Sequence, residues 1–214
     1  TDKGLQRLAA QAKEAGAVVV PVDRRKLDAM SFTRSHQGVI ALCAAHDYYT
    51  IDDILAEAAA RGQAPLIVIC DELSDPHNLG AILRSAECAG AHGVIIPKRR
   101  SVGLTATVAK ASAGAMEYMK VARVTNINNA IAELKDKGVW IFGTAAEGSI
   151  PMYQADLKGP AAIVIGNEGD GMSPLVRKNC DVTVHIPMEG KISSLNASAA
   201  ASILLYEAVR QRLG

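Results

Sequence analysis

The feature that most constrains this fold is a regular alternation of short apolar runs with helical patterns beyond Pro65. Strands are expected at 66–71, 93–97, 119–124, 139–145, 162–166 and 182–187, and helices at 77–89, 105–112, 126–137, 174–179 and 195–213. Apolar, β-branched strands that alternate with helices form a mostly parallel sheet with helices on both faces. Such sheets bind ligands outside the carboxyl ends of their strands. The sequence therefore predicts an α/β domain with its site at that edge.

Residues 1–62 show a different, smaller pattern. It predicts helices at 2–15 and 52–61, a turn of helix near Leu27, and strands at 17–22 and 38–44. The polar joint 62–65 follows, and Pro65 cannot continue the preceding helix. We therefore expect a small N-terminal α/β domain over 1–62 and a second domain over 65–214.

Composition limits the class of protein. The chain is 49% hydrophobic, which suffices for a buried core, yet no apolar run approaches the roughly 20 residues that span a bilayer. The first residues form a polar helical pattern rather than a signal peptide, so we expect a soluble cytoplasmic protein. The four cysteines show no CxxC spacing and the five histidines never fall at i, i+4. This pattern indicates neither a disulfide nor a metal site.

A net charge of +1 hides a local excess of positive charge. Residues 98–123 hold six basic side chains and one acid, Glu117. A solvated surface is the ordinary explanation of such a run, and RNA binding is the other. The candidate RNA-binding residues are Lys98, Arg99, Arg100 and Lys110. Aromatic residues make up only 4% of the chain, which favours contacts with phosphate, ribose and RNA shape over base stacking.

Three polar blocks follow predicted strands. The first, 75–84, holds Asn78 and Arg84; the second, 166–171, holds Glu168; the third runs from 186 to 196 and ends in Ser-Ser-Leu-Asn. Their glycines, asparagines and serines suit backbone that approaches a ligand closely. Because these blocks lie at strand ends, they predict one shared site.

Each polar residue also has a purely structural explanation. Asp75-Pro76 is a typical helix start, and Asn78 beside it could assist the cap. Arg84 lies opposite an apolar stripe and could form a surface ion pair with Glu87. Ser194 could cap the last helix. The residues alone leave these alternatives open. The apolar stripe consists of Leu79, Ile82, Leu83 and Ala86.

The second block nearly spells a phosphate-binding loop. Met172, however, stands where that loop requires a lysine. The block also fails the dinucleotide fingerprint, because Pro174 replaces its third glycine. A nucleotide-dependent enzyme is therefore disfavoured.

In order and spacing, the three blocks resemble the motifs of the SpoU (TrmH-type) branch of the SPOUT RNA 2′-O-ribose methyltransferases, over about residues 65–214. The resemblance implies a SPOUT fold with a C-terminal trefoil knot, which ordinary topology rules would exclude. It also implies S-adenosyl-L-methionine as methyl donor and structured RNA as substrate. Residues 97–101 and 36–39 resemble the group that methylates a guanosine ribose in 23S rRNA. Compared with such proteins, the N-terminal domain is expected to lack its opening strand.

The resemblance also assigns residues to roles. The implied catalytic residues are Asn78, Arg84, Glu168, Ser194 and Asn196. The implied cofactor-binding residues are Thr144, Gly166, Ile186, Met188 and Leu195. The resemblance implies that the arginine accepts the proton of the ribose hydroxyl. A guanidinium is a reluctant base, so we expect Arg84 instead to stabilise the ribose alkoxide as a cation and to hold the adjacent phosphate. The proton would pass to a phosphate oxygen, water or Glu168.

Other functions and the assembly state remain expectations. The same chemistry on tRNA, and a non-catalytic RNA-binding or assembly protein of the same fold, are the alternatives. The helix 195–213 is too apolar to face water along its whole girth. We therefore expect a homodimer in which this helix and the helix of the first block meet their mates.

Overall fold

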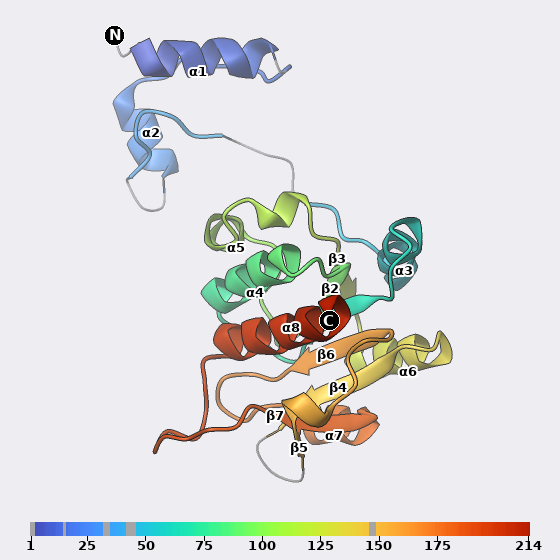
Figure 1. The fold of residues 1–214 in the computed structure, drawn as a ribbon. Helices are drawn as coiled ribbons and strands as arrows, with labels where there is room; N and C mark the ends of the chain where they lie inside the picture. The colour runs from blue at the N-terminus through green and yellow to red at the C-terminus, as the bar shows by residue number, and fades with distance from the viewer. Residues whose placement is uncertain (1–2, 15, 32–34, 42–45, 146–148) are drawn as a thin grey trace. The chain divides into compact units, whose positions relative to one another are not determined.

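The computed structural model describes residues 3–14, 16–31, 35–41, 46–145 and 149–214. The chain divides into two compact units, Thr1–Ala45 and His46–Gly214 (Figure 1). The joint at 62–65 thus lies inside the second unit, together with the helix before it. The assignment of 1–62 to substrate binding and of 65–214 to methyl transfer stays a prediction.

The described residues of the first unit form two helices, α1 (Lys3–Glu14) and α2 (Arg24–Met30), close to the predicted positions. Asp23 caps α2 by accepting a hydrogen bond from the backbone N–H of Lys26 at 2.8 Å. The predicted strand at 17–22 is wrong: the segment forms no strand, because no described segment of this unit pairs with it. Of the strand predicted at 38–44, residues 38–41 form none and 42–44 lie outside the described residues.

The second unit is built on a seven-stranded, wholly parallel sheet, as the alternating pattern predicted. The strand order is β3-β2-β1-β6-β4-β7-β5. The strands are β1 (Leu66–Cys70), β2 (Gly93–Pro97), β3 (Val121–Val124), β4 (Trp140–Thr144), β5 (Ile150–Pro151), β6 (Ala161–Ile165) and β7 (Val182–His185). The sequence pattern missed β5, because two residues are too short to show a period.

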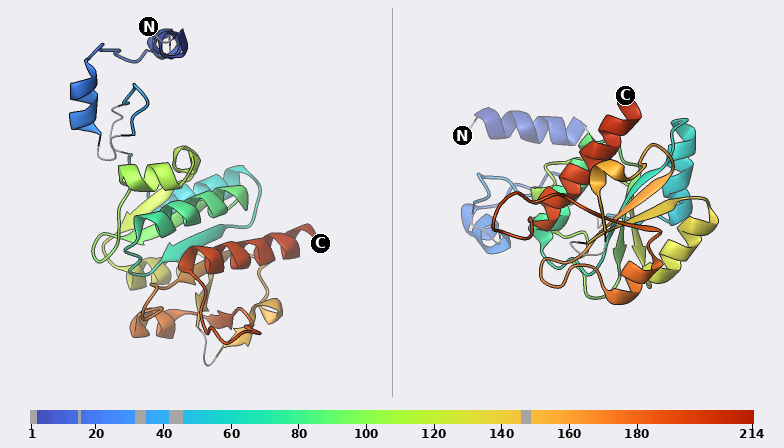
Figure 2. Two further views of the ribbon diagram at one scale, coloured as in Figure 1. Left: turned by 90° about the vertical axis from the view of Figure 1, so that its left-hand side faces the viewer. Right: turned by 60° about the horizontal axis from the view of Figure 1, so that its bottom comes forward.

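Helices cover both faces of this sheet (Figures 1 and 2). One face carries α4 (Pro76–Cys88), α5 (Ala106–Ala111) and α8 (Ala197–Leu213), and the other carries α3 (Ile51–Ala60), α6 (Ile127–Asp136) and α7 (Pro174–Asn179). Two short 3-10 helices, η1 (Ala115–Glu117) and η2 (Met152–Gln154), complete the unit. In β1, Leu66 and Val68 enter one core while Ile67 and Ile69 enter the other. This alternation makes β1 a shared wall of two hydrophobic cores. The trefoil knot stays a prediction.

Helix α4 packs closely against its neighbours. Its predicted apolar stripe is fully buried, and Arg84 is exposed on the other side, as expected. At Gly80 a Cβ atom would lie 2.4 Å from the Cβ of Ala111, so only glycine permits this approach of α4 to α5. Helix α8 lies beside α4, and the Ser85 and Ser202 hydroxyls join the two helices at 2.7 Å.

Arg212 fastens the last turn of α8 to the sheet at the amino ends of its strands. Its guanidinium donates hydrogen bonds of 2.7–3.0 Å to the carbonyls of Ala64, Pro65, Leu157 and Gly159. These carbonyls lie just before β1 and β6. Burial lowers the pKa of Arg212. The arginine therefore holds α8 to the two central strands.

His92 is buried just before β2. The backbone N–H of Leu66 donates to its Nδ1 at 3.0 Å, so the proton of the neutral ring lies on Nε2, which donates to Gln63 at 3.0 Å. Burial, followed by the positive charges of Arg61 and Arg212, lowers the pKa of His92. The buried ring is thus held neutral.

No described helix combines the length and the apolar character needed to cross a membrane.

Candidate active site

The first two polar blocks follow β1 and β6, which are neighbouring strands, so the two blocks begin side by side. Strands β1 and β6 are paired with Cys70 opposite Ile165, so Asp71 and Gly166 emerge together at the carboxyl edge. The Asp71 N–H donates to the Ile165 carbonyl at 2.8 Å. Its buried carboxylate accepts from the backbone N–H of Ser173 at 2.7 Å. Asp71 therefore ties the far end of the second block back to the end of β1.

Asn78 is the centre of the site. It is 6% exposed; its Nδ2 donates to the Glu168 Oε1 at 2.5 Å, and its Oδ1 accepts from the Asn196 Nδ2 at 2.9 Å. Asp75 caps α4 instead, by accepting from the His77 N–H at 2.8 Å. The capping alternative for Asn78 is therefore wrong. One residue from each block enters this hydrogen-bonded chain, as their positions at strand ends predicted.

Asn196, rather than a serine, begins α8. Its Oδ1 accepts from the backbone N–H groups of Ser198 at 2.9 Å and Ala199 at 3.3 Å. The amide nitrogen is then left to donate to Asn78. Ser194 is exposed in the loop before the helix and does not cap it. Asn196 thus fixes the start of α8 and the position of Asn78 together.

The second block is a self-supporting loop. The Asn167 Oδ1 accepts from the N–H groups of Gly169 and Asp170, both at 2.8 Å, and the Asn167 backbone pairs with Gly171. At Gly166 a Cβ would lie 2.2 Å from the Gly171 carbonyl carbon. Glycine is therefore required there. Sequence reasoning missed Asn167, although asparagine two residues before glycine is a known turn signal.

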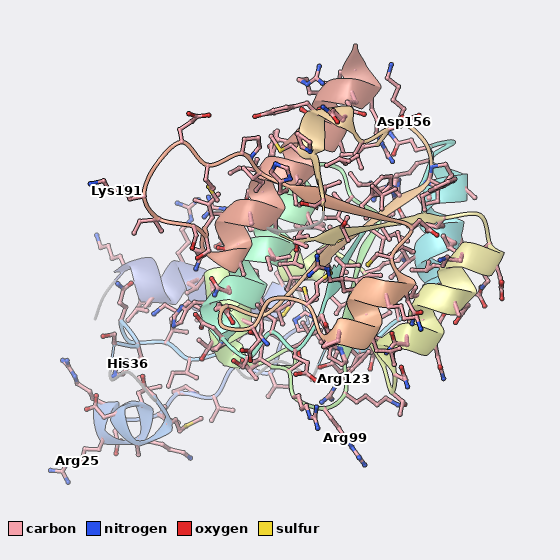
Figure 3. The ribbon with its side chains drawn as sticks, turned by 90° about the horizontal axis from the view of Figure 1, so that it is seen from below. Arg25, His36, Arg99, Arg123, Asp156 and Lys191 are labelled. Carbon is pink, nitrogen blue, oxygen red and sulfur yellow. The ribbon has the colours of Figure 1, made fainter. Side chains whose placement is uncertain are left out.

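A cavity of about 900 Å³ lies beside this chain of hydrogen bonds. The second block, the ends of β4 and β7, the loop 186–195 and the start of α8 enclose it. It is lined by every predicted cofactor-binding residue: Thr144, Gly166, Ile186, Met188 and Leu195. Glu168 and Ser194 line it too, whereas Asn78, Arg84 and Asn196 do not. In Figure 3, Lys191 marks the loop between β7 and α8.

Among the cavity-lining residues that sequence reasoning missed are Arg177 and His185. His185 is the last residue of β7, and its Nδ1 lies 2.9 Å from the Ser149 hydroxyl. Its place directly before the third block is the signal that could have identified it.

Arg84 stands apart from the hydrogen-bonded residues. It is exposed on α4, and among the described residues no hydrogen bond or ion pair joins it to Asn78, Glu168 or Asn196. Nor does it form the alternative pair with Glu87 in the part of the chain that the structure describes. A single chain therefore does not bring Arg84 into contact with the predicted catalytic residues.

The predicted RNA-binding residues differ in whether another side chain pairs with them. Lys98 and Arg99 are exposed directly after β2, at the same edge as the cavity, while Arg100 pairs with Glu72 at 3.1 Å. Lys110 is exposed on α5. Arg123 donates to the Lys98 carbonyl at 3.3 Å, which places it near Arg99 in Figure 3.

The aromatic neighbour of Arg123 was not foreseen. The Arg123 guanidinium lies 5.2 Å from the ring of Tyr48, whose hydroxyl accepts from the Leu104 N–H at 3.0 Å. This stacking fixes Arg123 and so braces the basic turn after β2.

The described residues contain no cluster of three potential metal ligands. Cys70, Cys88 and Cys180 are free, and Cys43 lies outside the described residues. Burial raises the pKa of the Cys70 thiol to about 12 and that of Cys180 to about 11. Both thiols are therefore held in the unreactive protonated form.

The chain belongs to the SpoU rRNA Methylase family, whose model matches residues 65–206. Residues 1–49 match a second model, for RNA 2′-O ribose methyltransferase substrate binding. The 23S rRNA (guanosine-2′-O-)-methyltransferase RlmB of Shewanella oneidensis is 47% identical over 211 residues, which are 99% of this chain and 85% of that protein.

Two solved structures share the fold. The AdoMet-bound rRNA methyltransferase of Sinorhizobium meliloti matches with a TM-score of 0.80 and 26% identity, over 98% of this chain and 78% of that one. The SpoU methyltransferase AviRb of Streptomyces viridochromogenes, in complex with AdoMet, matches with a TM-score of 0.67 and 34% identity, over 71% and 62%.

Proposed function

We propose that this protein transfers a methyl group from S-adenosyl-L-methionine to the ribose 2′-hydroxyl of a guanosine in 23S rRNA. The observation that carries the proposal is the hydrogen-bonded chain from Asn196 through Asn78 to Glu168, which joins all three motifs at the rim of one cavity. The relation to RlmB supports the choice of 23S rRNA and guanosine.

The cavity fits S-adenosyl-L-methionine. Gly166 lets the backbone of the second block close tightly, and Glu168 and Asp170 place carboxylates along the wall. Carboxylates suit a cationic sulfonium. When bound, the cofactor supplies a methyl group on a positively charged sulfur. Thr144, Gly166, Ile186, Met188 and Leu195 would hold it.

The protein's own residues position the ribose. Asn78 occupies one oxygen of Glu168 and so orients that carboxylate, while Ser194 presents a hydroxyl at the cavity. An in-line displacement gains much of its rate from such positioning. The second oxygen of Glu168 would accept the hydroxyl proton, unless a phosphate oxygen or water does so.

Arg84 would act once two copies of the chain are together. Exposed residues of α4 and α8 form the surface around it, and Tyr206 on α8 is 51% exposed. A homodimer built on α4 and α8 would cover this aromatic residue and place Arg84 at the interface. There its charge would stabilise the ribose alkoxide and hold the adjacent phosphate.

Structured RNA would lie along the carboxyl edge of the sheet. Lys98, Arg99, Arg100 and Lys110 would contact phosphates, and residues 1–62 would select the RNA element. An rRNA substrate would place the protein in the cytoplasm. Neither a metal nor a membrane enters this scheme.

One experiment tests the function. The protein is incubated with labelled S-adenosyl-L-methionine and total RNA, and ribose methylation is then mapped. We expect label at one guanosine of 23S rRNA and none in tRNA. Label only in tRNA would move the same chemistry to tRNA. Cofactor binding without transfer to any RNA would favour a non-catalytic RNA-binding protein.

A further inference from the structure

His185 is the histidine of the cavity, and the proposed chemistry gives it no role. It is half-buried at the end of β7, and its Nδ1 lies 2.9 Å from the Oγ of Ser149, just before β5. We infer that Ser149 holds His185 as the Nδ1–H tautomer, so that its Nε2 accepts a hydrogen bond from the adenosine part of the methyl donor. The ligand in this inference rests on the proposed function.

The position of the proton follows from the partners of Ser149. Its Oγ lies 2.8 Å from the carbonyl oxygen of Ala145. Two oxygens so close, with no proton between them, would repel each other, so the hydroxyl donates to the carbonyl. Ser149 then accepts from the Nδ1–H of His185. A neutral imidazole carries one N–H, which leaves a lone pair on Nε2.

The surroundings indicate what this lone pair meets. Among the described residues no hydrogen bond or ion pair involves Nε2, although Arg177 and Lys191 line the same cavity. Glu168 and Asp170 are acceptors and cannot pair with it. Water can donate to this half-buried nitrogen in the free protein, and a bound adenosine would replace it with the adenine amine or a ribose hydroxyl. The neighbouring Val184, Ile186 and the Thr144 side of β4 give the adenosine an apolar wall.

The tautomer can be tested without any ligand. Long-range ¹H–¹⁵N spectra of the ring distinguish a protonated Nδ1 from a protonated Nε2. We expect a protonated Nδ1 at His185 in the unchanged protein and loss of this preference in Ser149→Ala. A protonated Nε2 in the unchanged protein overturns the inference, whether or not the cofactor binds.

Calorimetry with S-adenosylhomocysteine tests the contact. We expect His185→Leu to bind it roughly 2- to 10-fold more weakly, which corresponds to one lost hydrogen bond. His185→Gln should keep most of the affinity, because its amide oxygen can stand in for Nε2. His46→Leu is the matched control, since His46 pairs with Glu117 and does not line the cavity.

The results distinguish a failure of this inference about His185 from a failure of the proposed function. Equal affinity of His185→Leu and the unchanged protein overturns this inference and leaves the proposed function intact. No binding by the unchanged protein overturns both. S-inosylhomocysteine, which lacks the amine, identifies the donor. If His185→Leu loses the preference for the adenosine ligand, the amine is the donor; if it keeps the preference, a ribose hydroxyl is.

Discussion

The Asn196 side chain donates to that of Asn78 at 2.9 Å across 118 positions of sequence. Both side chains make a second contact: Asn196 also caps α8, and Asn78 also holds Glu168. Asn78 is buried, and a buried amide left without a partner costs about 1–3 kcal/mol, so this residue is held to both of its partners. The starts of α4 and α8 therefore keep a fixed relation.

Removing the Asn78 amide should separate catalysis from cofactor binding. In Asn78→Ala we expect methyl transfer to fall at least ~100-fold, because Glu168 loses its orientation, and stability to fall by about 1–3 kcal/mol. Cofactor affinity should change little, since Asn78 does not line the cavity. Single-turnover assays, calorimetry and urea unfolding measure the three quantities.

A matched control exists in another asparagine pair. Asn179 donates to Asn128 at 2.7 Å between α7 and α6. Asn128→Ala should lose stability through the same kind of bond while retaining transfer. If both variants lose transfer equally, the effect of Asn78 is only structural.

Arg84 should matter for transfer and not for donor binding. We expect Arg84→Ala to bind S-adenosyl-L-methionine normally and to transfer methyl at least ~100-fold more slowly, because an exposed cation that stabilises the alkoxide is lost. Calorimetry and a methylation assay measure this. Glu87→Ala, on the same helix, is the control and should be fully active. Normal transfer by Arg84→Ala would remove it from the catalytic set.

His92 should make stability depend on pH. Its pKa is lowered in the fold, whereas an unfolded chain has an ordinary value of about 6.5. Below that pH the unfolded state binds a proton that the folded state does not, so stability present above about pH 6.5 is lost as pH falls towards the folded pKa. His92→Asn keeps an acceptor for the Leu66 N–H and cannot titrate.

Urea unfolding at about pH 7.5 and pH 5.5 tests this dependence. The unchanged protein should lose more stability than His92→Asn on acidification, so that the gap between them narrows. His77→Asn, at an exposed position on α4, should run parallel to the unchanged protein. A gap that stays constant would contradict the linkage.

The basic turn after β2 should bind RNA through phosphates. We expect Arg99→Ala to weaken all RNAs alike and to lower the salt slope by about 1, because phosphate contacts carry no sequence information. Arg100→Ala should have a smaller effect, since Glu72 already compensates its charge. Binding titrations at several salt concentrations measure both. Loss of the cognate RNA alone would show that Arg99 reads sequence or shape.

Local signals and the geometry of parallel sheets made much of this predictable. Asp75-Pro76 set the start of α4, its apolar stripe set the buried face, and strand ends at one edge brought the three blocks together. The choice of Asn196 over Ser194 as the cap needed the tertiary partner Asn78. The strand expected at 17–22 failed because a strand depends on a neighbour that its own sequence does not contain.

The contacts of Arg212 indicate when the site forms during folding. The 17-residue helix α8 begins with the Asn196 cap at the carboxyl edge and ends near Arg212 at the opposite edge. It follows every strand of the sheet in sequence, and two of the four carbonyls that anchor it lie 147 and 148 positions earlier in the chain. Contacts so distant in sequence form late. A nascent chain that still lacks α8 has neither Asn196 nor the wall of the cavity that α8 forms, so cofactor binding reports that the fold is complete.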